Sequence, residues 1–171
     1  LVLYMDVGKA WFIKILKTPL VSLLQDQTMS LDIVDAMSLD RIESRFRKVK
    51  VRVEAIIQAM YKNVTPDGVP LPFVTFLDSL TKHESFIPNN FLTPFELHRL
   101  TVNKYGALQS PTKAAKQMMI GFFMLGKHLV GKILLRPQDI GINVNVKELA
   151  RKNFKVIASI IWHAFLKYIR R

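Results

Sequence analysis

Seven apolar residues in the first half of the chain follow one another at alternating steps of three and four positions. They are Leu39, Ile42, Phe46, Val49, Val53, Ile56 and Met60. Because an α-helix has about 3.6 residues per turn, these steps keep the side chains on one side of a helix for about six turns. Ser38 stands just before them and is a suitable N-cap. The spacing therefore predicts a long helix over residues 39–62 with one apolar side, and we call these seven residues the apolar seam.

Most of the remaining chain also favours helix. Apolar residues recur mainly at helical spacing, and the period-two alternation of a half-buried strand appears only in the short stretch 140–146. Pro19 lies inside the first apolar segment, where it either kinks one helix or opens a second piece capped by Thr18. Thr93 and Asn145 each precede a glutamate by three positions, the pattern of a capping box. The expected helices cover about residues 6–27, 30–36, 39–62, 72–82, 93–106, 110–136 and 145–171, and residues 65–68 suit a type I turn.

Length and composition are consistent with one domain. The chain has 171 residues, 50% of them hydrophobic, which is enough to bury a core without disulfide or metal support. It has no cysteine, which excludes disulfides, thiolate-bound zinc and thiol catalysis. We therefore predict an all-α protein, a compact bundle of about five to seven helices with little or no β structure, formed by a single domain over residues 1–171.

The most apolar stretch, residues 118–135, is interrupted by Lys127, His128 and Lys132. A membrane-spanning helix needs roughly 18 to 20 predominantly apolar residues without such breaks, so we expect a buried helix here. Glycines recur within it at intervals of five, a spacing that forms no phosphate-binding loop and indicates close packing against a neighbouring helix. These glycines are Gly121, Gly126 and Gly131.

Basic residues greatly outnumber acidic ones. The chain has 25 Lys and Arg against 13 Asp and Glu, a formal net charge of +12. An excess of this size makes a compact fold repel itself and exceeds what solubility requires, so it indicates an anionic partner. Nucleic acid is the first such partner to consider, followed by a polyanionic glycan and an anionic membrane surface. The alternatives are a solvated basic surface and a neighbouring acidic subunit.

Several of these cations share one side of the predicted helix 39–62, within an arc of about 60°. This basic stripe comprises Arg41, Arg45, Lys48 and Arg52. Arg47 and Lys50 have acids four residues away in Glu43 and Glu54, whereas the stripe residues have only one another at such spacing. Because neighbouring like charges destabilise a helix, we expect phosphates or sulfates to neutralise the stripe through the forked donors of Arg. In the internal alternative, acids just upstream pack back against it, namely Asp26, Asp32, Asp35 and Asp40.

A second basic line opens the last predicted helix. It comprises Lys147, Arg151 and Lys155 at steps of four, joined by Lys152, and Glu148 is its acidic neighbour. If this line and the basic stripe face the same way, they form one extended surface for an anionic polymer.

The last helix is apolar on most of its sides. One interpretation is a central core helix around which the others pack. The other is a helix that docks on a partner or lies at a membrane interface, with aromatic rings near the headgroups and terminal cations on anionic lipid. The residues that would make such a contact are Trp162, Phe165, Tyr168, Arg170 and Arg171.

No pattern in the sequence indicates catalysis. The four histidines are far apart and form no metal-binding pair, and no phosphate-binding loop or nucleophile elbow is present. We therefore expect structural histidines, no enzymatic activity, no catalytic residue, no cofactor and no bound metal. The histidines are His83, His98, His128 and His163.

The leading hypothesis is a non-enzymatic binding module for an anionic polymer, most simply the backbone of RNA or DNA within a ribonucleoprotein or nucleocapsid-type assembly. Backbone contact through cations implies weak sequence preference and strong salt dependence. One alternative is a secreted or membrane-associated interaction protein that uses its apolar C-terminal helix. Another is a structural subunit of a larger complex, covered by protein partners.

Overall fold

The computed structural model describes residues 2–26, 29–34, 36–65, 67–82, 119–140 and 146–170, and the side chains in these ranges except those of 2–5, 81, 139–140 and 168–170. No strand occurs in the described ranges, and the predicted all-α fold is confirmed. The predicted helix 93–106 lies outside them. In order, the elements are α1 (Val2–Gln25), α2 (Leu39–Asn63), α3 (Leu71–Lys82), the π-helix η2 (Phe122–Leu134), the 3-10 helix η3 (Pro137–Ile140) and α6 (Glu148–Arg170).

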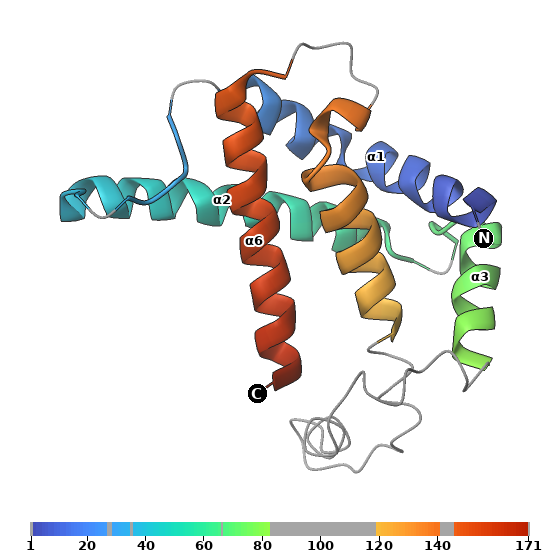
Figure 1. The fold of residues 1–171 in the computed structure, drawn as a ribbon. Helices are drawn as coiled ribbons and strands as arrows, with labels where there is room; N and C mark the ends of the chain where they lie inside the picture. The colour runs from blue at the N-terminus through green and yellow to red at the C-terminus, as the bar shows by residue number, and fades with distance from the viewer. Residues whose placement is uncertain are drawn as a thin grey trace.

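The helices cross around α1, which contacts α2, α3, η2 and α6. η2 and α6 run side by side in opposite directions, and α2 crosses behind them (Figure 1). The N-terminal part of α2 extends well past its crossing with α6, whereas its C-terminal part lies under α1. One end of the longest amphipathic helix therefore projects from the body of the protein.

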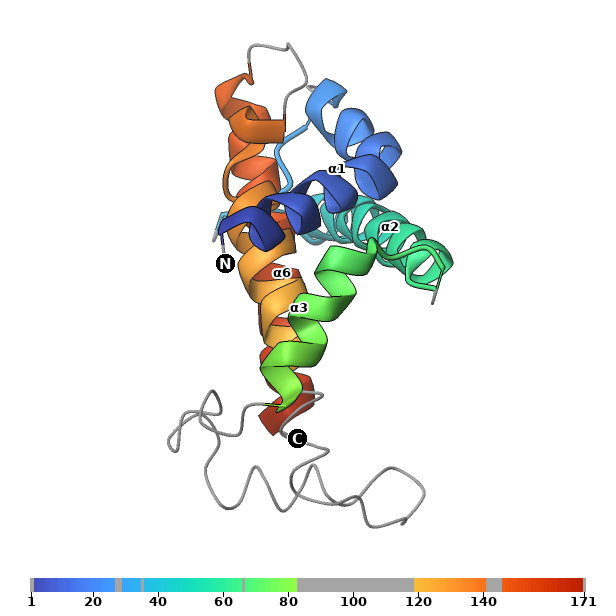
Figure 2. The ribbon, with the colours of Figure 1, turned by 90° about the vertical axis from the view of Figure 1, so that its right-hand side faces the viewer.

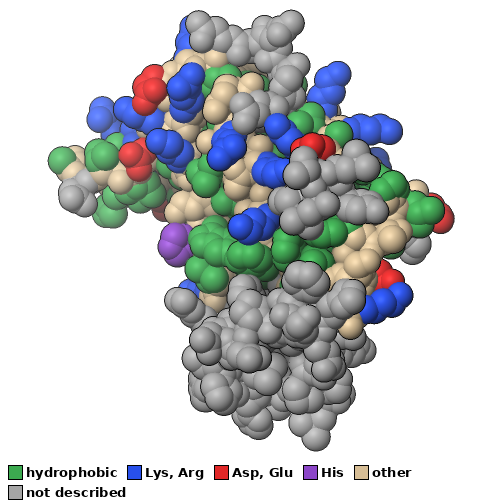
Figure 3. All heavy atoms as spheres, turned by 45° about the vertical axis from the view of Figure 1, so that its right-hand side comes forward, with side chains coloured by type: hydrophobic (Ala, Val, Ile, Leu, Met, Phe, Trp, Pro, Cys, Tyr) green, Lys and Arg blue, Asp and Glu red, His purple; other side chains and the backbone are tan. Residues whose placement is uncertain are grey.

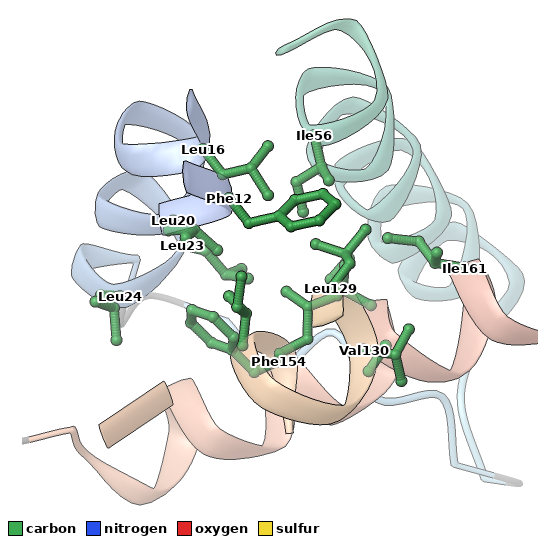
Figure 4. Close-up of a cluster of buried hydrophobic side chains, with 14 of the residues drawn as sticks. Phe12, Leu16, Leu20, Leu23, Leu24, Ile56, Leu129, Val130, Phe154 and Ile161 are labelled. Carbon is green, nitrogen blue, oxygen red and sulfur yellow. The ribbon is translucent and has the colours of Figure 1, made fainter. Parts of the chain in front are cut away.

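The hydrophobic core lies where these helices meet. Figure 4 shows its side chains converging between α1, α2, η2 and α6. Burying one large apolar side chain completely contributes about 1.5–3 kcal/mol, so the helices are held together mainly by this cluster. Fully buried members are Phe12, Leu16 and Leu20 of α1, Ile56 of α2, Leu129 and Ile133 of η2, and Phe154 and Ile157 of α6.

α1 is one helix that includes Pro19. The second piece capped by Thr18 is therefore wrong, and Figure 2 shows instead that α1 changes direction along its length, as expected when proline removes a backbone hydrogen bond. The predicted turn at 65–68 is present, because the Gly68 N–H donates to the Thr65 carbonyl at 3.0 Å. The Trp11 indole N–H donates to the Gly68 carbonyl at 2.7 Å and so fastens this turn to α1.

The predicted short helix over 30–36 is wrong. Residues 29–34 have no helical structure, and the buried amide of Asn153 on α6 binds their backbone. Its Oδ1 accepts from the Leu31 N–H at 2.8 Å, and its Nδ2 donates to the Met29 carbonyl at 3.1 Å. A helix here would need these same backbone groups for its own hydrogen bonds, so the contact with α6 holds the segment in another conformation.

The glycines of the apolar stretch 118–135 pack against a neighbouring helix as expected, but the helix that carries them is not an α-helix. η2 is a π-helix, in which backbone bonds join residues five apart, so residues at this spacing lie nearly above one another. A Cβ atom on Gly126 would lie 2.7 Å from the Trp162 ring, and one on Gly121 would lie 2.8 Å from the Phe165 ring. Gly131 instead faces the backbone of its own helix, so close packing against α6 is confirmed at two of the three positions.

Candidate anion-binding surface

The C-terminal end of the basic stripe is neutralised within the fold. A guanidinium nitrogen of Arg52 on α2 lies 2.8 Å from Oδ2 of Asp26, just after α1, and another donates to the hydroxyl of Ser22. The side chains of Arg52 and Asp26 are 25% and 12% exposed, so water screens this ion pair only partly. The internal alternative holds at this position. Arg52 is therefore corrected from a candidate ligand for anions to a link between α1 and α2.

The N-terminal end of the stripe is open. Arg41 is exposed and Arg45 half-buried, and neither forms an ion pair with a carboxylate of the described residues. The expected pairs at spacing four do form, Arg47 with Glu43 at 3.0 Å and Lys50 with Glu54 at 3.8 Å. Lys48, the remaining stripe residue, is half-buried and already has an interaction partner within the protein. The charge available to an external anion on α2 is therefore concentrated at Arg41 and Arg45.

The exposure of the apolar seam shows that the first turns of α2 lie outside the region where the helices cross. Val49 and Ile56 are buried where α2 crosses the other helices, as predicted. Leu39 and Phe46, however, are 80% and 62% exposed, so the described structure leaves the start of the seam uncovered. The first turns of α2 thus present apolar and basic side chains together.

The second basic line occupies the start of α6. Lys147, Arg151 and Lys155 are exposed, and Arg151 donates through Nε to the carbonyl of Val146 at 3.2 Å. Lys155 borders a groove between α2 and α6, whereas Arg52 borders a separate depression between α1 and α2. The basic stripe and the basic line of α6 therefore face different sides of α2, and they do not form one extended surface.

Basic side chains missed by the sequence analysis add to the surface. Lys14 and Lys17 of α1 and Arg136 after η2 are exposed. Lys and Arg gather over the upper half of the face in Figure 3, where acidic side chains are few. Asp6 is the single acidic residue in the 24 residues of α1, and this local imbalance could have identified Lys14 and Lys17 beforehand.

Two aromatic residues of the candidate contact set on α6, Trp162 and Phe165, pack inside the protein. Trp162 and Phe165 are half-buried against the glycines of η2, and the rings of Trp162 and Phe122 meet edge to face at 5.9 Å. This packing favours the core interpretation of α6. The side chains of Tyr168 and Arg170, and all of Arg171, lie outside the described part. Among the described helices, none has the length and apolar character needed to cross a membrane.

His128 is a packing residue in the middle of η2. Its ring is completely buried, stacks on Phe12 at 6.0 Å and meets the edge of Phe73 at 5.0 Å. Its Nδ1 donates to the Phe123 carbonyl at 2.8 Å, since a carbonyl oxygen can only accept. The exposed His163 contacts the carbonyl of Ser159 within its own helix. Over the described residues, no three His, Asp or Glu side chains are grouped so as to hold a metal ion, and His83 and His98 lie outside them.

No protein-family model matches this chain, and neither the curated proteins nor the solved structures contain a significant match to it. The functional argument therefore depends on the exposed charges and surfaces of the molecule itself.

Proposed function

We propose that this protein is a non-enzymatic module that binds an anionic polymer, most simply the phosphate backbone of RNA or DNA. The observation that carries the proposal is a set of exposed or half-buried cations that form no ion pair with a described carboxylate, in a chain of net charge +12, namely Arg41, Arg45, Arg151 and Lys155. Arg41 and Arg45 at the projecting end of α2 are the primary contacts. Arg151 and Lys155 at the start of α6 are secondary contacts, and Lys147, which already has an interaction partner within the protein, lies beside them.

The chemistry of these residues suits phosphate. Arginine presents planar, forked donors that match two oxygens of one phosphate, and it keeps its charge at any physiological pH. A helix that projects from the protein can approach a polymer without bringing the rest of the surface into contact. Contacts of this kind recognise charge spacing and not base identity, so the affinity depends steeply on salt and only weakly on sequence.

A salt titration tests the proposal. Binding of single-stranded RNA and of duplex DNA is measured by fluorescence anisotropy at several salt concentrations, for the wild type and for Arg41→Gln combined with Arg45→Gln. Each phosphate contact contributes about 0.9 to the slope of log K against log salt on duplex DNA, so the double variant is expected to lower the slope by about 1.8. Arg47→Gln combined with Lys50→Gln is the matched control, because it removes the same number of charges from cations already paired with Glu43 and Glu54.

The measured affinities and salt slopes are compared with those of the wild type, of the control and of heparin. A double variant whose affinity and slope equal those of the wild type removes the projecting end of α2 from the proposal. Equal losses in the control double variant would mean that net charge alone is responsible. A parallel titration with heparin separates the two kinds of polymer, since tighter binding to heparin than to either nucleic acid at equal salt would identify a sulfated glycan as the better ligand.

A further inference from the structure

An open groove of about 820 Å³ lies between α2, residues 31–33 and α6. Three large apolar side chains, one from each of these elements, remain substantially exposed along it. Ile33 is 51% exposed, Phe46 is 62% exposed and Ile160 is 37% exposed. A soluble surface seldom leaves apolar side chains grouped in this way without a ligand or partner. The groove therefore has the character of a recognition surface.

The dimensions of the groove match one face of a helix. On α2, the apolar side chains of Phe46, Val49 and Val53 follow one another at steps of three and four, and on α6 Val156 and Ile160 are four apart. The α2 wall runs from Phe46 to Glu54 and the α6 wall from Lys152 to Ile160, so both walls are about two helical turns long, or about 12 Å at 1.5 Å per residue. Grooves of this kind receive apolar side chains at positions i, i+3 or i+4 and i+7 of an amphipathic helix.

The charges at the rim of the groove determine which kind of helix it can bind. Lys152 and Lys155 stand on the α6 side, both exposed and without an ion pair to any described carboxylate. On the α2 side, Lys50 is already paired with Glu54 at 3.8 Å. A matching helix therefore carries acidic residues along the edge that faces α6.

Other occupants fit less well. A second copy presenting the same face would bring the lysines of α6 close to lysines, which is repulsive. A phosphate backbone would meet an apolar floor and the carboxylates of Asp32 and Glu54. A flat membrane surface does not fill a concave groove.

The wall formed by residues 31–33 is held in place before any partner arrives. Leu31 is 1% exposed, and its backbone N–H is bound by Asn153 of α6. Preorganisation of this kind lowers the entropic cost of binding. Beyond the groove, the apolar seam continues to the exposed Leu39, so a longer helix could extend its contact along α2.

We propose that this groove binds an amphipathic helix of another protein, with the apolar face of that helix on Phe46, Val53 and Ile160 and its acidic edge against Lys152 and Lys155. The proposal goes beyond polyanion binding and does not rest on its primary contacts, because Arg41 and Arg45 do not line the groove, whereas Lys155 is shared by the two surfaces.

Two synthetic peptides test the proposal by fluorescence anisotropy. Each is a side-chain-stapled helix of about five turns with leucines at i, i+3 and i+7. One carries glutamates along a single edge, and the other carries lysines at the same positions. The full chain is expected to bind the glutamate peptide saturably and the lysine peptide roughly tenfold more weakly.

Substitutions then locate the site. Lys152→Glu combined with Lys155→Glu is expected to weaken the glutamate peptide roughly tenfold and to strengthen the lysine peptide. Phe46→Ser is expected to weaken both peptides, and because Phe46 is largely exposed the variant should fold, which urea denaturation checks. The matched controls are Lys14→Glu combined with Lys17→Glu, which changes the net charge equally, and Ile57→Ser, which removes an exposed apolar side chain outside the groove.

Several outcomes would overturn the proposal. These are failure of both peptides to bind, and equal effects of the groove variants and their controls. A third is self-association of the wild type in sedimentation experiments that Phe46→Ser abolishes, because the occupant would then be a second copy. A fourth is binding of anionic phospholipid vesicles that Phe46→Ser abolishes, since the occupant would then be lipid.

Discussion

Asn153 on α6 binds the backbone of Leu31, 122 positions earlier in the chain, through a buried hydrogen bond of 2.8 Å. The same amide donates to the carbonyl of Met29 at 3.1 Å. One side chain thus satisfies both a donor and an acceptor of the segment between α1 and α2. It also positions the segment that forms one wall of the groove.

Replacement of Asn153 by alanine is expected to lower the free energy of unfolding by about 1–3 kcal/mol, because the Leu31 N–H and the Met29 carbonyl would lose their partner. Urea denaturation measures the change. Ser159→Ala on the exposed side of the same helix serves as the control and should cost less than about 0.5 kcal/mol. A similar, small loss in both variants would mean that water replaces the amide of Asn153 freely.

Asp26→Asn is expected to destabilise the fold by about 1–3 kcal/mol, since it leaves the partly buried guanidinium of Arg52 without its carboxylate. Glu43→Gln is a matched control that breaks the ion pair with Arg47, whose two side chains are 78% and 71% exposed. That pair should contribute no more than about 0.5 kcal/mol. Equal effects in denaturation experiments would contradict the view that the contact between α1 and α2 depends on Asp26.

Gly126→Ala is expected to destabilise the protein by about 1–3 kcal/mol, even though alanine is the better helix former. The added methyl group would lie 2.7 Å from the ring of Trp162, so η2 and α6 would have to move apart. In a Trp162→Leu background the smaller side chain should relieve most of this cost. Additive losses in the double variant, measured by thermal or urea unfolding, would show that the two positions are not in contact.

Hydrogen exchange along α2 should be uneven. Amides near Phe46, where the apolar seam is bare, are expected to exchange at least roughly tenfold faster than amides near Ile56, where α2 crosses the core. Mass spectrometry or NMR would measure the difference. Uniform protection along the helix would indicate that another part of the chain or a second molecule covers its first turns.

Local sequence patterns predicted those features whose positions depend on interactions between residues close in the sequence. The apolar seam predicted a helix over 39–62 and the structure has one over Leu39–Asn63, because the apolar periodicity determines where such a helix lies. Ser38 precedes the helix as predicted, but its side chain makes no capping hydrogen bond. The ion pair of Arg47 with Glu43 was predicted for the same reason. Helix 30–36 was wrong because Asn153, far away in sequence, binds that backbone.

The candidate site could be predicted only in part. The four stripe residues do lie on α2, as predicted. Which of them an internal acid neutralises depends on how α1 packs against α2, and in the sequence Asp26 was one of four candidate acids. The π-helical form of η2 was also missed, since the interval of five between Gly121 and Gly126 was interpreted on the geometry of an α-helix. The groove arises from three separated segments, and no local pattern predicts their meeting.

The projection of the N-terminal end of α2 from the body of the protein has an electrostatic consequence. Between Val49, where the helix enters the core, and Arg41 near its tip, eight residues at 1.5 Å each give a distance of about 12 Å. At physiological ionic strength the Debye length is about 8 Å, so charges on the body of the protein have little influence at the tip. The field there depends on the immediate neighbours of Arg41, and changes of net charge made elsewhere in the chain should leave the attraction of this end for anions unaltered.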